Sequence, residues 1–146
     1  MSDRSDELAM MVLEEAVVYA TEQLERSGVC LPFGILLDSA EQRERLTPPH
    51  QDPEAGYEAL EEAVRGQIAT RDIAVVLLAL DTPLPAHIAK DRPPSIRLHL
   101  EERSQLGKVV GARYLYIPYH LEPVGEGVQM RLQTPIPVGI RAEYIV

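Results

Sequence analysis

Apolar side chains recur at helical spacing in two stretches of the chain. The first, residues 3–27, contains neither glycine nor proline, carries acids near its start and stops at Gly28. The second follows Asp52 and Pro53, a pair typical of a helix N-cap with proline in the first turn, and runs to about Thr70. Each stretch has one apolar and one charged face. The pattern therefore predicts two amphipathic helices.

Shorter apolar runs predict strands between and after these helices. Residues 31–38, "LPFGILLD", favour β-structure, and residues 43–46 can fold back on them after a turn. Residues 72–81 are apolar at odd and even positions alike, which is typical of a strand buried on both faces, and we expect a second subunit to provide cover. Residues 81–94 hold four prolines and no periodicity, so they predict a long surface connection, either a mobile lid or a disordered loop.

Clean alternation of apolar and polar residues marks the C-terminal part of the chain. Residues 95–103, 108–122 and 128–134 each alternate and are separated by turns that contain glycine. The remaining tail adds at most one edge strand, because its two prolines cannot donate ladder hydrogen bonds. We predict one α+β domain over residues 1–146, with a single antiparallel sheet of five to six strands and two helices in the order α-β-β-α-β-β-β-β.

Register assigns the side chains of these strands to faces, because a shift of one residue moves every side chain to the other face. If Ile96 lies opposite Leu115, and Leu121 lies opposite Met130, one face becomes a continuous apolar wall. The wall consists of Ile96, Leu98, Leu100, Leu115, Ile117, Leu121, Val128, Met130 and Leu132. The opposite, polar face carries Arg97, His99, Glu101, Tyr114, Tyr116, His120, Gln129, Arg131 and Gln133. An antiparallel sheet with one solvated face has this pattern.

The polar face has two interpretations. Tyrosine is common in strands, so its rings can simply line a solvated sheet. Alternatively, the face binds a protein partner or an anionic small molecule, since Tyr and Arg are the residues that most often anchor contacts. The candidate binding residues are Arg97, Tyr114, Tyr116, His120 and Arg131. Pro118 lacks an N–H, so its strand either bulges or lies open there, and a bulge would turn Tyr119 toward the other two tyrosines.

Composition and charge limit the classes of partner. The net charge of −9 disfavours nucleic-acid binding, because affinity for a phosphate backbone comes largely from Lys and Arg. Residues 1–62 carry 15 acidic and 4 basic side chains, whereas residues 63–146 carry 8 and 10, so an anion-binding surface is expected in the C-terminal half. The polar start predicts no secretory signal, and the longest apolar run, residues 73–80, is too short to span a bilayer. We expect a bacterial, cytoplasmic protein with neither membrane nor nucleic-acid partners.

No pattern of residues predicts a cofactor, a metal ion or a catalytic group. In the expected register His99 lies opposite Ala112, about 26 Å along the strand from His120, so these imidazoles cannot share a metal ion. Cys30, the only cysteine, precedes a strand in an apolar setting and is typical of a core residue. The serines have no nucleophile-elbow context. We therefore predict no cofactor, no metal site and no catalytic residue.

The order of elements resembles known small α+β domains. The stretch "GILLD" followed by a turn is similar to the first hairpin of roadblock proteins, and the order helix, strand, strand, helix, strand resembles the roadblock and profilin-like group. In place of the usual glycine after the aspartate stands "SAEQRE". The order is also similar to cystatin-like domains of the nuclear-transport-factor type, in which a curved sheet wraps helices around a pocket. "LPFG" after a helix resembles uncharacterised bacterial α+β proteins. A shared fold implies architecture and not activity.

Two functions are compatible with these patterns. The first is a non-enzymatic interaction or regulatory module that forms a homodimer and meets a protein partner through the polar face. The alternative is a small-molecule binding protein, or a small enzyme, with a pocket for an anionic ligand between the sheet and the first helix. That pocket would use Asp38, Arg113 and Tyr119, because Arg113 falls on the otherwise apolar face and a buried arginine requires an anionic partner.

Overall fold

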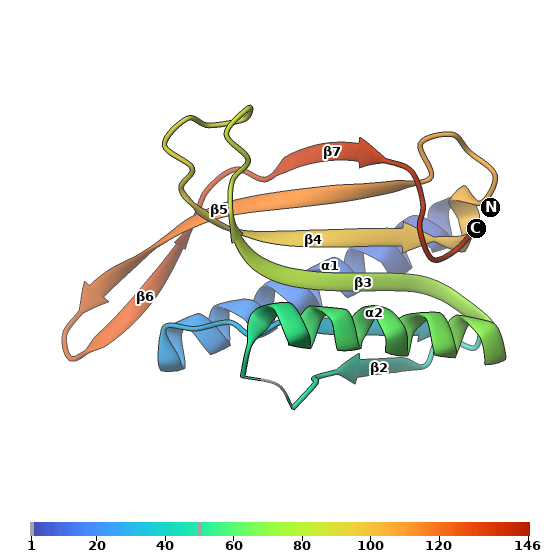
Figure 1. The fold of residues 1–146 in the computed structure, drawn as a ribbon, viewed down its shortest axis with the longest axis horizontal. Helices are drawn as coiled ribbons and strands as arrows, with labels where there is room; N and C mark the ends of the chain where they lie inside the picture. Colours follow the sequence, from blue (N-terminus) through green and yellow to red (C-terminus); the bar gives the residue numbers. More distant parts are fainter. Residues whose placement is uncertain (1, 50) are drawn as a thin grey trace.

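The computed structural model describes residues 2–49 and 51–146 and contains a single antiparallel sheet with one helix on each face (Figure 1). The elements are α1 (Ser2–Ser27), β1 (Phe33–Asp38), β2 (Arg43–Leu46), α2 (Pro53–Thr70), β3 (Ile73–Pro83), β4 (Pro94–Glu102), the 3-10 turn η1 (Arg103–Gln105), β5 (Ala112–Val124), β6 (Gly127–Leu132) and β7 (Ile136–Ile140). The predicted α+β class, the two helices and the antiparallel sheet are confirmed. The sheet has seven strands instead of five or six, because the tail contributes β7.

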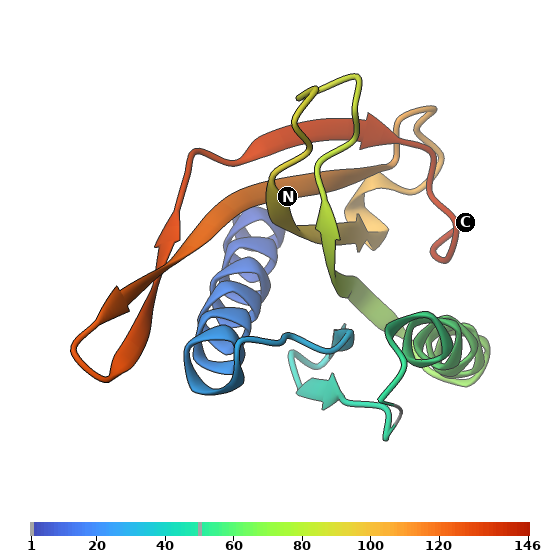
Figure 2. The same ribbon diagram turned by 60° about the vertical axis from the view of Figure 1, so that its left-hand side comes forward.

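The strands lie in the order β2-β1-β3-β4-β5-β6, and β7 pairs with β5. The first half of β5, residues 112–116, lies between β4 and β7. The second half, residues 119–124, continues with β6 as a two-stranded ribbon. Figure 2 shows this ribbon curling around α1, which is drawn in blue. The curvature leaves the α1 side of the sheet concave.

The helices begin and end where the sequence predicts. Gly28 adopts a positive φ of 76° directly after α1, a conformation that costs glycine little, and its N–H donates to Leu24 at 2.8 Å. At the start of α2 the Asp52 carboxylate accepts the N–H of Ala55 at 3.1 Å, which satisfies one of the exposed donors of the first turn. Neither helix is long and apolar enough to cross a membrane, within the residues that the structure describes.

Each face of the sheet packs an apolar cluster against its own helix. On the α1 side Val75, Leu77 and Ala79 of β3 join the larger cluster, and on the α2 side Val76 and Leu78 join the smaller one. The prediction that β3 is buried on both faces is therefore confirmed. The prediction that a second subunit covers it is wrong, because α1 and α2 of the same chain already do so.

The predicted register is right for one hairpin and shifted for the other. Leu121 pairs with Met130, as expected. Ile96 pairs with Ile117 instead of Leu115, and His99 pairs with Tyr114 instead of Ala112. The shift is two residues, which preserves the face of every side chain because the period of a strand is two. The apolar and polar faces are therefore assigned correctly, although the pairs between β4 and β5 are not.

Pro118 does not create a bulge in β5. It pairs in register with Ser95 of β4, and its carbonyl accepts the N–H of Gln133 at 2.8 Å. The irregularity lies on the opposite side. Two residues of β5, 117 and 118, face three residues, 133–135, which connect β6 to β7. Because β5 stays regular, Tyr119 points to the α1 side and is almost fully buried, so the expectation that it joins the other tyrosines is wrong.

The connection predicted over residues 81–94 is shorter in the structure. β3 runs to Pro83 and β4 starts at Pro94, and these two prolines pair at the end of the ladder, where a missing N–H is tolerated. The remaining loop is closed by its own contacts: Leu84 is buried, its N–H donates to Pro93, and its carbonyl accepts the Arg92 Nε at 3.0 Å.

Candidate functional site

Arg97 of β4 lies at the centre of an aromatic cluster on the α2 side of the sheet. The Cζ atom of its guanidinium stands 4.5 Å from the ring centroid of Tyr114 and 5.4 Å from that of Tyr57. Tyr114 and Tyr116 of β5 contact each other edge to face, with ring centroids 5.8 Å apart. Tyr57 reaches this cluster from α2. We call Arg97, Tyr57, Tyr114 and Tyr116 the Arg97 face.

The guanidinium of Arg97 is only partly satisfied. Its Nη2 donates to the Tyr57 hydroxyl at 3.0 Å, whereas its Nε is buried and has no hydrogen-bond acceptor. Among the described residues no carboxylate pairs with it. Burial would lower the pKa of Arg97, but the nearby oxygens of Tyr57 and Tyr114 outweigh burial, and the pKa stays above its usual value. The face therefore carries one positive charge that the protein does not neutralise.

Two tyrosines of the face, Tyr57 and Tyr116, remain protonated around neutral pH. Burial raises the pKa of Tyr57, and the neighbouring Arg97 cation opposes this shift without cancelling it. Burial likewise raises the pKa of Tyr116. Neutral phenols donate hydrogen bonds and offer ring faces and edges for contact. The face is thus suited to binding an anion beside an apolar group.

A buried carboxylate lies next to the Arg97 face. Glu101 accepts the backbone N–H groups of Glu143, Tyr144 and Ile145 at 2.8, 2.9 and 2.9 Å. Its Oε2 also accepts from the Nε2 of His99 at 2.7 Å. Burial alone would raise the pKa of Glu101, but these four hydrogen bonds together hold it below its usual value. One carboxylate therefore fixes the returning tail to the sheet.

The burial of His99 and Glu101 corrects the prediction of a uniformly solvated polar face. Both residues are about 1% exposed. The tail covers them, since the Tyr144 ring lies 5.3 Å from the His99 ring and the Tyr144 hydroxyl donates to Glu61 of α2 at 2.7 Å. Tyr116 is also buried, whereas Tyr114 is half-buried. Only part of the predicted face is therefore open to a partner.

His120 and Arg131 do not belong to the Arg97 face. They pair with each other on the β5–β6 ribbon, beyond the first residue of β4. His120 lies four residues beyond Tyr116, about 13 Å along an extended strand. Arg131 is occupied by an exposed ion pair with Glu122, which lowers the pKa of that carboxyl group. The structure thus brings together three of the five predicted binding residues, and it separates these two from them.

Asp38, Arg113 and Tyr119 do not converge on one pocket. Asp38 ends β1 and accepts the N–H groups of Ala40 and Gln42, both at 2.9 Å, which hold its pKa below the usual value. Tyr119 lies near the other end of β3, where its hydroxyl donates to Asp81 at 2.9 Å. Asp38 and Tyr119 therefore serve local turns and packing at opposite ends of the sheet.

Arg113 lines a separate cavity of about 290 Å³ between the start of α1 and the sheet. Its side chain is 47% exposed and lies 3.9 Å from Glu102, so the expectation of a buried arginine is wrong. Asp6 and Glu102 contribute acids to the same cavity. Burial raises the pKa of Glu102, although Arg113 opposes the shift. The acids make this cavity less suited to an anion than the Arg97 face.

Cys30 and the acidic residues offer no further chemical centre. Burial, followed by the charge of Asp81, raises the pKa of the Cys30 thiol to about 12, so the thiolate that would act as a nucleophile is scarce at neutral pH. Within residues 2–49 and 51–146 no group of three or more His, Cys, Asp and Glu side chains is placed to hold a metal ion.

Several residues of the site escape prediction from the sequence. Tyr57 shows only the helical spacing of a core residue, and Tyr144 lies in a tail without periodicity. Both reach the sheet through tertiary contacts across many residues of chain. Local pattern supplies only the alternation of β4 and β5, which predicts Arg97, Tyr114 and Tyr116. Comparison of the chain with models of protein families, with curated proteins and with solved structures gave no match in any of the three.

Proposed function

We propose that this chain is a non-enzymatic interaction or regulatory module of the bacterial cytoplasm, which acts as a homodimer and receives a carboxylate of its partner at the Arg97 face. The observation that carries the proposal is the guanidinium of Arg97, which has one protein acceptor and a buried Nε without any. A buried charged donor that lacks an acceptor costs free energy. The Nε itself is out of reach of a ligand, so a partner carboxylate would meet the guanidinium at its Nη groups and supply the negative charge that the described residues do not.

A carboxylate suits the charge of the face better than a phosphate does. Arg97 contributes one unneutralised positive charge, and a guanidinium can hold a carboxylate through two parallel hydrogen bonds. The carboxylates of Glu61 and Glu101 belong to the adjoining contacts of Tyr144. A phosphate monoester, with about two negative charges, would be repelled more strongly by them.

The side chains around Arg97 favour binding over catalysis. The phenols of Tyr57 and Tyr116 have a raised pKa and do not act as bases near neutral pH. The carboxylate of Glu101 is already engaged in four hydrogen bonds. A side chain that is fully engaged in holding the fold is poorly placed to move protons for a substrate.

An NMR titration with benzoate and with acetate at constant ionic strength tests the carboxylate site. We expect shifts centred on the backbone amides of Tyr57, Arg97 and Tyr114, larger for benzoate because its ring contacts the tyrosines. Arg97→Gln should abolish the response, and Arg97→Lys, which keeps the charge without the planar fork, should weaken it. Arg113→Gln is the matched control and should leave the response unchanged.

The same titration decides between the two arginine sites. A response that survives in Arg97→Gln and disappears in Arg113→Gln assigns the anion to the cavity beside α1, which is the alternative function. No response to either carboxylate in the wild-type protein means that the carboxylate site is wrong. Melting curves of each variant, followed by circular dichroism, separate loss of binding from loss of fold.

Sedimentation at micromolar concentration tests the homodimer independently of the ligand. The expected result is a species of twice the chain mass that dissociates on dilution. Both faces of β3 are covered by α1 and α2, so β3 does not need a second subunit to bury it. The proposal of self-association therefore rests on the exposed part of the Arg97 face alone. A chain that stays monomeric over the whole concentration range contradicts it.

A further inference from the structure

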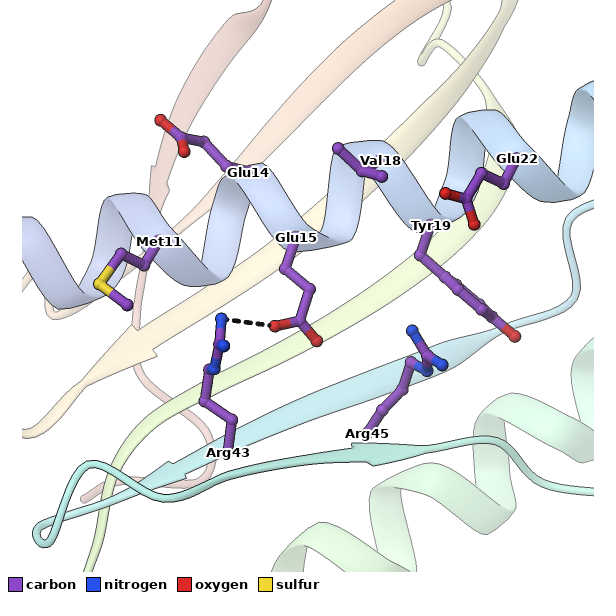
Figure 3. A pocket seen from close by; sticks show the side chains of 8 residues that line it. All are labelled: Met11, Glu14, Glu15, Val18, Tyr19, Glu22, Arg43 and Arg45. Carbon is purple, nitrogen blue, oxygen red and sulfur yellow. Dashed lines mark hydrogen bonds and ion pairs between the residues drawn. The ribbon is translucent and has the colours of Figure 1, made fainter.

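A groove of about 450 Å³ runs between α1 and the edge strand β2, on the face of the sheet opposite to the Arg97 face. Figure 3 shows α1 forming one wall and the side chains of Arg43 and Arg45 rising from β2 to form the other. Met11 and Val18 lie along the helical wall and are 41% and 57% exposed. They are seven residues apart, two turns of one helical face, and with Glu14 between them they form one stripe along α1.

The two basic side chains of the groove are already engaged within the protein. Arg43 pairs with Glu15 at 2.9 Å (Figure 3). The guanidinium of Arg45 lies over the ring of Tyr19, 4.1 Å from its centroid. Neither cation is therefore placed to attract an acidic partner, because each would first have to give up this contact.

Two acidic side chains of the groove remain without a partner. Glu14 and Glu22 line it beside Met11 and Val18, and neither forms an ion pair with any side chain that the structure describes. They are separated by eight residues, about 12 Å along the helix. The stripe therefore alternates apolar and negatively charged groups. Its complement is a helix with basic side chains about two turns apart and an apolar side chain between them.

We propose that this groove binds a basic amphipathic helix of another protein. The apolar residues of the partner contact Met11 and Val18, and its Lys or Arg residues pair with Glu14 and Glu22. Flexible methionine side chains suit such a surface because they adapt to different partners. A second copy of this chain fits less well, because its own α1 carries the same acidic side chains and like charges would meet. The proposal does not depend on the Arg97 face, so either can fail alone.

Binding of a designed peptide tests the groove. The probe is an acetylated and amidated peptide with two repeats of Lys-Leu-Ala-Lys-Leu-Ala-Lys, titrated by isothermal calorimetry at low and at moderate salt. We expect binding that weakens with salt, and none for the same peptide with Glu in place of Lys. The double variant Glu14→Gln with Glu22→Gln should weaken binding about fivefold, as expected for two exposed ion pairs. Val18→Ser should weaken it by a similar factor.

Matched controls separate the groove from the net charge of the protein. Glu58→Gln with Glu62→Gln removes the same charge from the exposed face of α2 and should change the affinity less than twofold. An equal loss in both double variants shows attraction to an acidic protein in general and overturns the proposal. Absence of binding at low salt also overturns it. If Val18→Ser instead dissociates a dimer of the chain, the occupant is a second copy and the proposed partner is wrong.

Discussion

Glu101 and Tyr144 are 43 residues apart in the chain, yet the Oε1 of Glu101 accepts the backbone N–H of Tyr144 at 2.9 Å in the interior of the protein. The same carboxylate holds the N–H groups of Glu143 and Ile145 and the ring of His99. Tyr144 and Ile145 complete the apolar cluster beneath α2. A single side chain thus attaches the end of the described chain to the face that carries Arg97.

Replacement of Glu101 should release this tail. Glu101→Gln replaces one acceptor oxygen by a donor NH₂ group that faces backbone N–H groups, so we expect the free energy of unfolding to fall by about 3 kcal/mol. Chemical denaturation followed by circular dichroism measures it. Glu102→Gln is the control: burial already raises the pKa of Glu102, so removing its charge should cost less than about 1 kcal/mol. Equal losses in the two variants would contradict the special role of Glu101.

The contribution of Glu101 should depend on pH in a predictable direction. Its folded-state pKa lies below the usual value of 4.5, so the folded protein binds this proton more weakly than the unfolded chain does. The stabilisation is therefore complete above about pH 5 and is lost as the pH falls through 4.5 toward the lowered pKa. Denaturation of the wild type and of Glu101→Gln between neutral and acidic pH should show their difference shrinking on acidification. A constant difference would argue against a charged Glu101.

The hydrogen bond from Tyr119 to Asp81 should control the pKa of that carboxyl group. Burial raises the pKa of Asp81, and the phenol opposes this shift because it donates to the charged form. Tyr119→Phe removes the donor, so we expect the pKa of Asp81 to rise further and the fold to lose about 1 kcal/mol. Carbon-detected NMR titration of the side-chain carboxyl measures the pKa. Tyr114→Phe, whose hydroxyl lies elsewhere, is the control and should leave it unchanged.

Two glycines should respond to alanine in opposite directions. A Cβ at Gly34 of β1 would lie 3.1 Å from the Leu78 Cδ2 and 3.3 Å from the Leu77 carbonyl oxygen, so Gly34→Ala should destabilise the fold by about 1–3 kcal/mol. A Cβ at Gly66 of α2 meets nothing within 4 Å, and Gly66→Ala should stabilise the fold by about 1 kcal/mol. Thermal melts report both. A stabilising Gly34→Ala would mean that β1 and β3 pack less closely.

The thiol of Cys30 should be unreactive in the folded protein. Cys30 is 5% exposed, and burial raises its pKa to about 12, so little thiolate is present and access is poor. We expect slow labelling by Ellman's reagent at about pH 8 in buffer and rapid, complete labelling in denaturant. Fast labelling of the native protein would indicate that the apolar cluster around Cys30 opens readily.

Local pattern was sufficient for both helices, for β1 to β6 and for the faces of these strands, but not for β7. Helical spacing and the caps at Gly28 and Asp52 predict both helices, and alternation in β4 to β6 assigns Arg97 and Tyr114 to the same side of the sheet. These features depend on residues within a few positions of each other. The predicted register of the β4–β5 hairpin is wrong by two residues. The faces of the side chains are still correct, because side chains of a strand repeat with a period of two.

The candidate site depended on contacts between distant parts of the chain. The buried state of His99 and Glu101 follows from the returning tail, and the partial satisfaction of Arg97 follows from Tyr57 on α2. Arg113, which alternation places on an apolar face, is half exposed because the cavity at the start of α1 leaves it open. Periodicity tells which side of a strand a residue occupies. Whether that side meets solvent, another element or a partner is decided by how the elements pack, since burial is a property of the assembled layers.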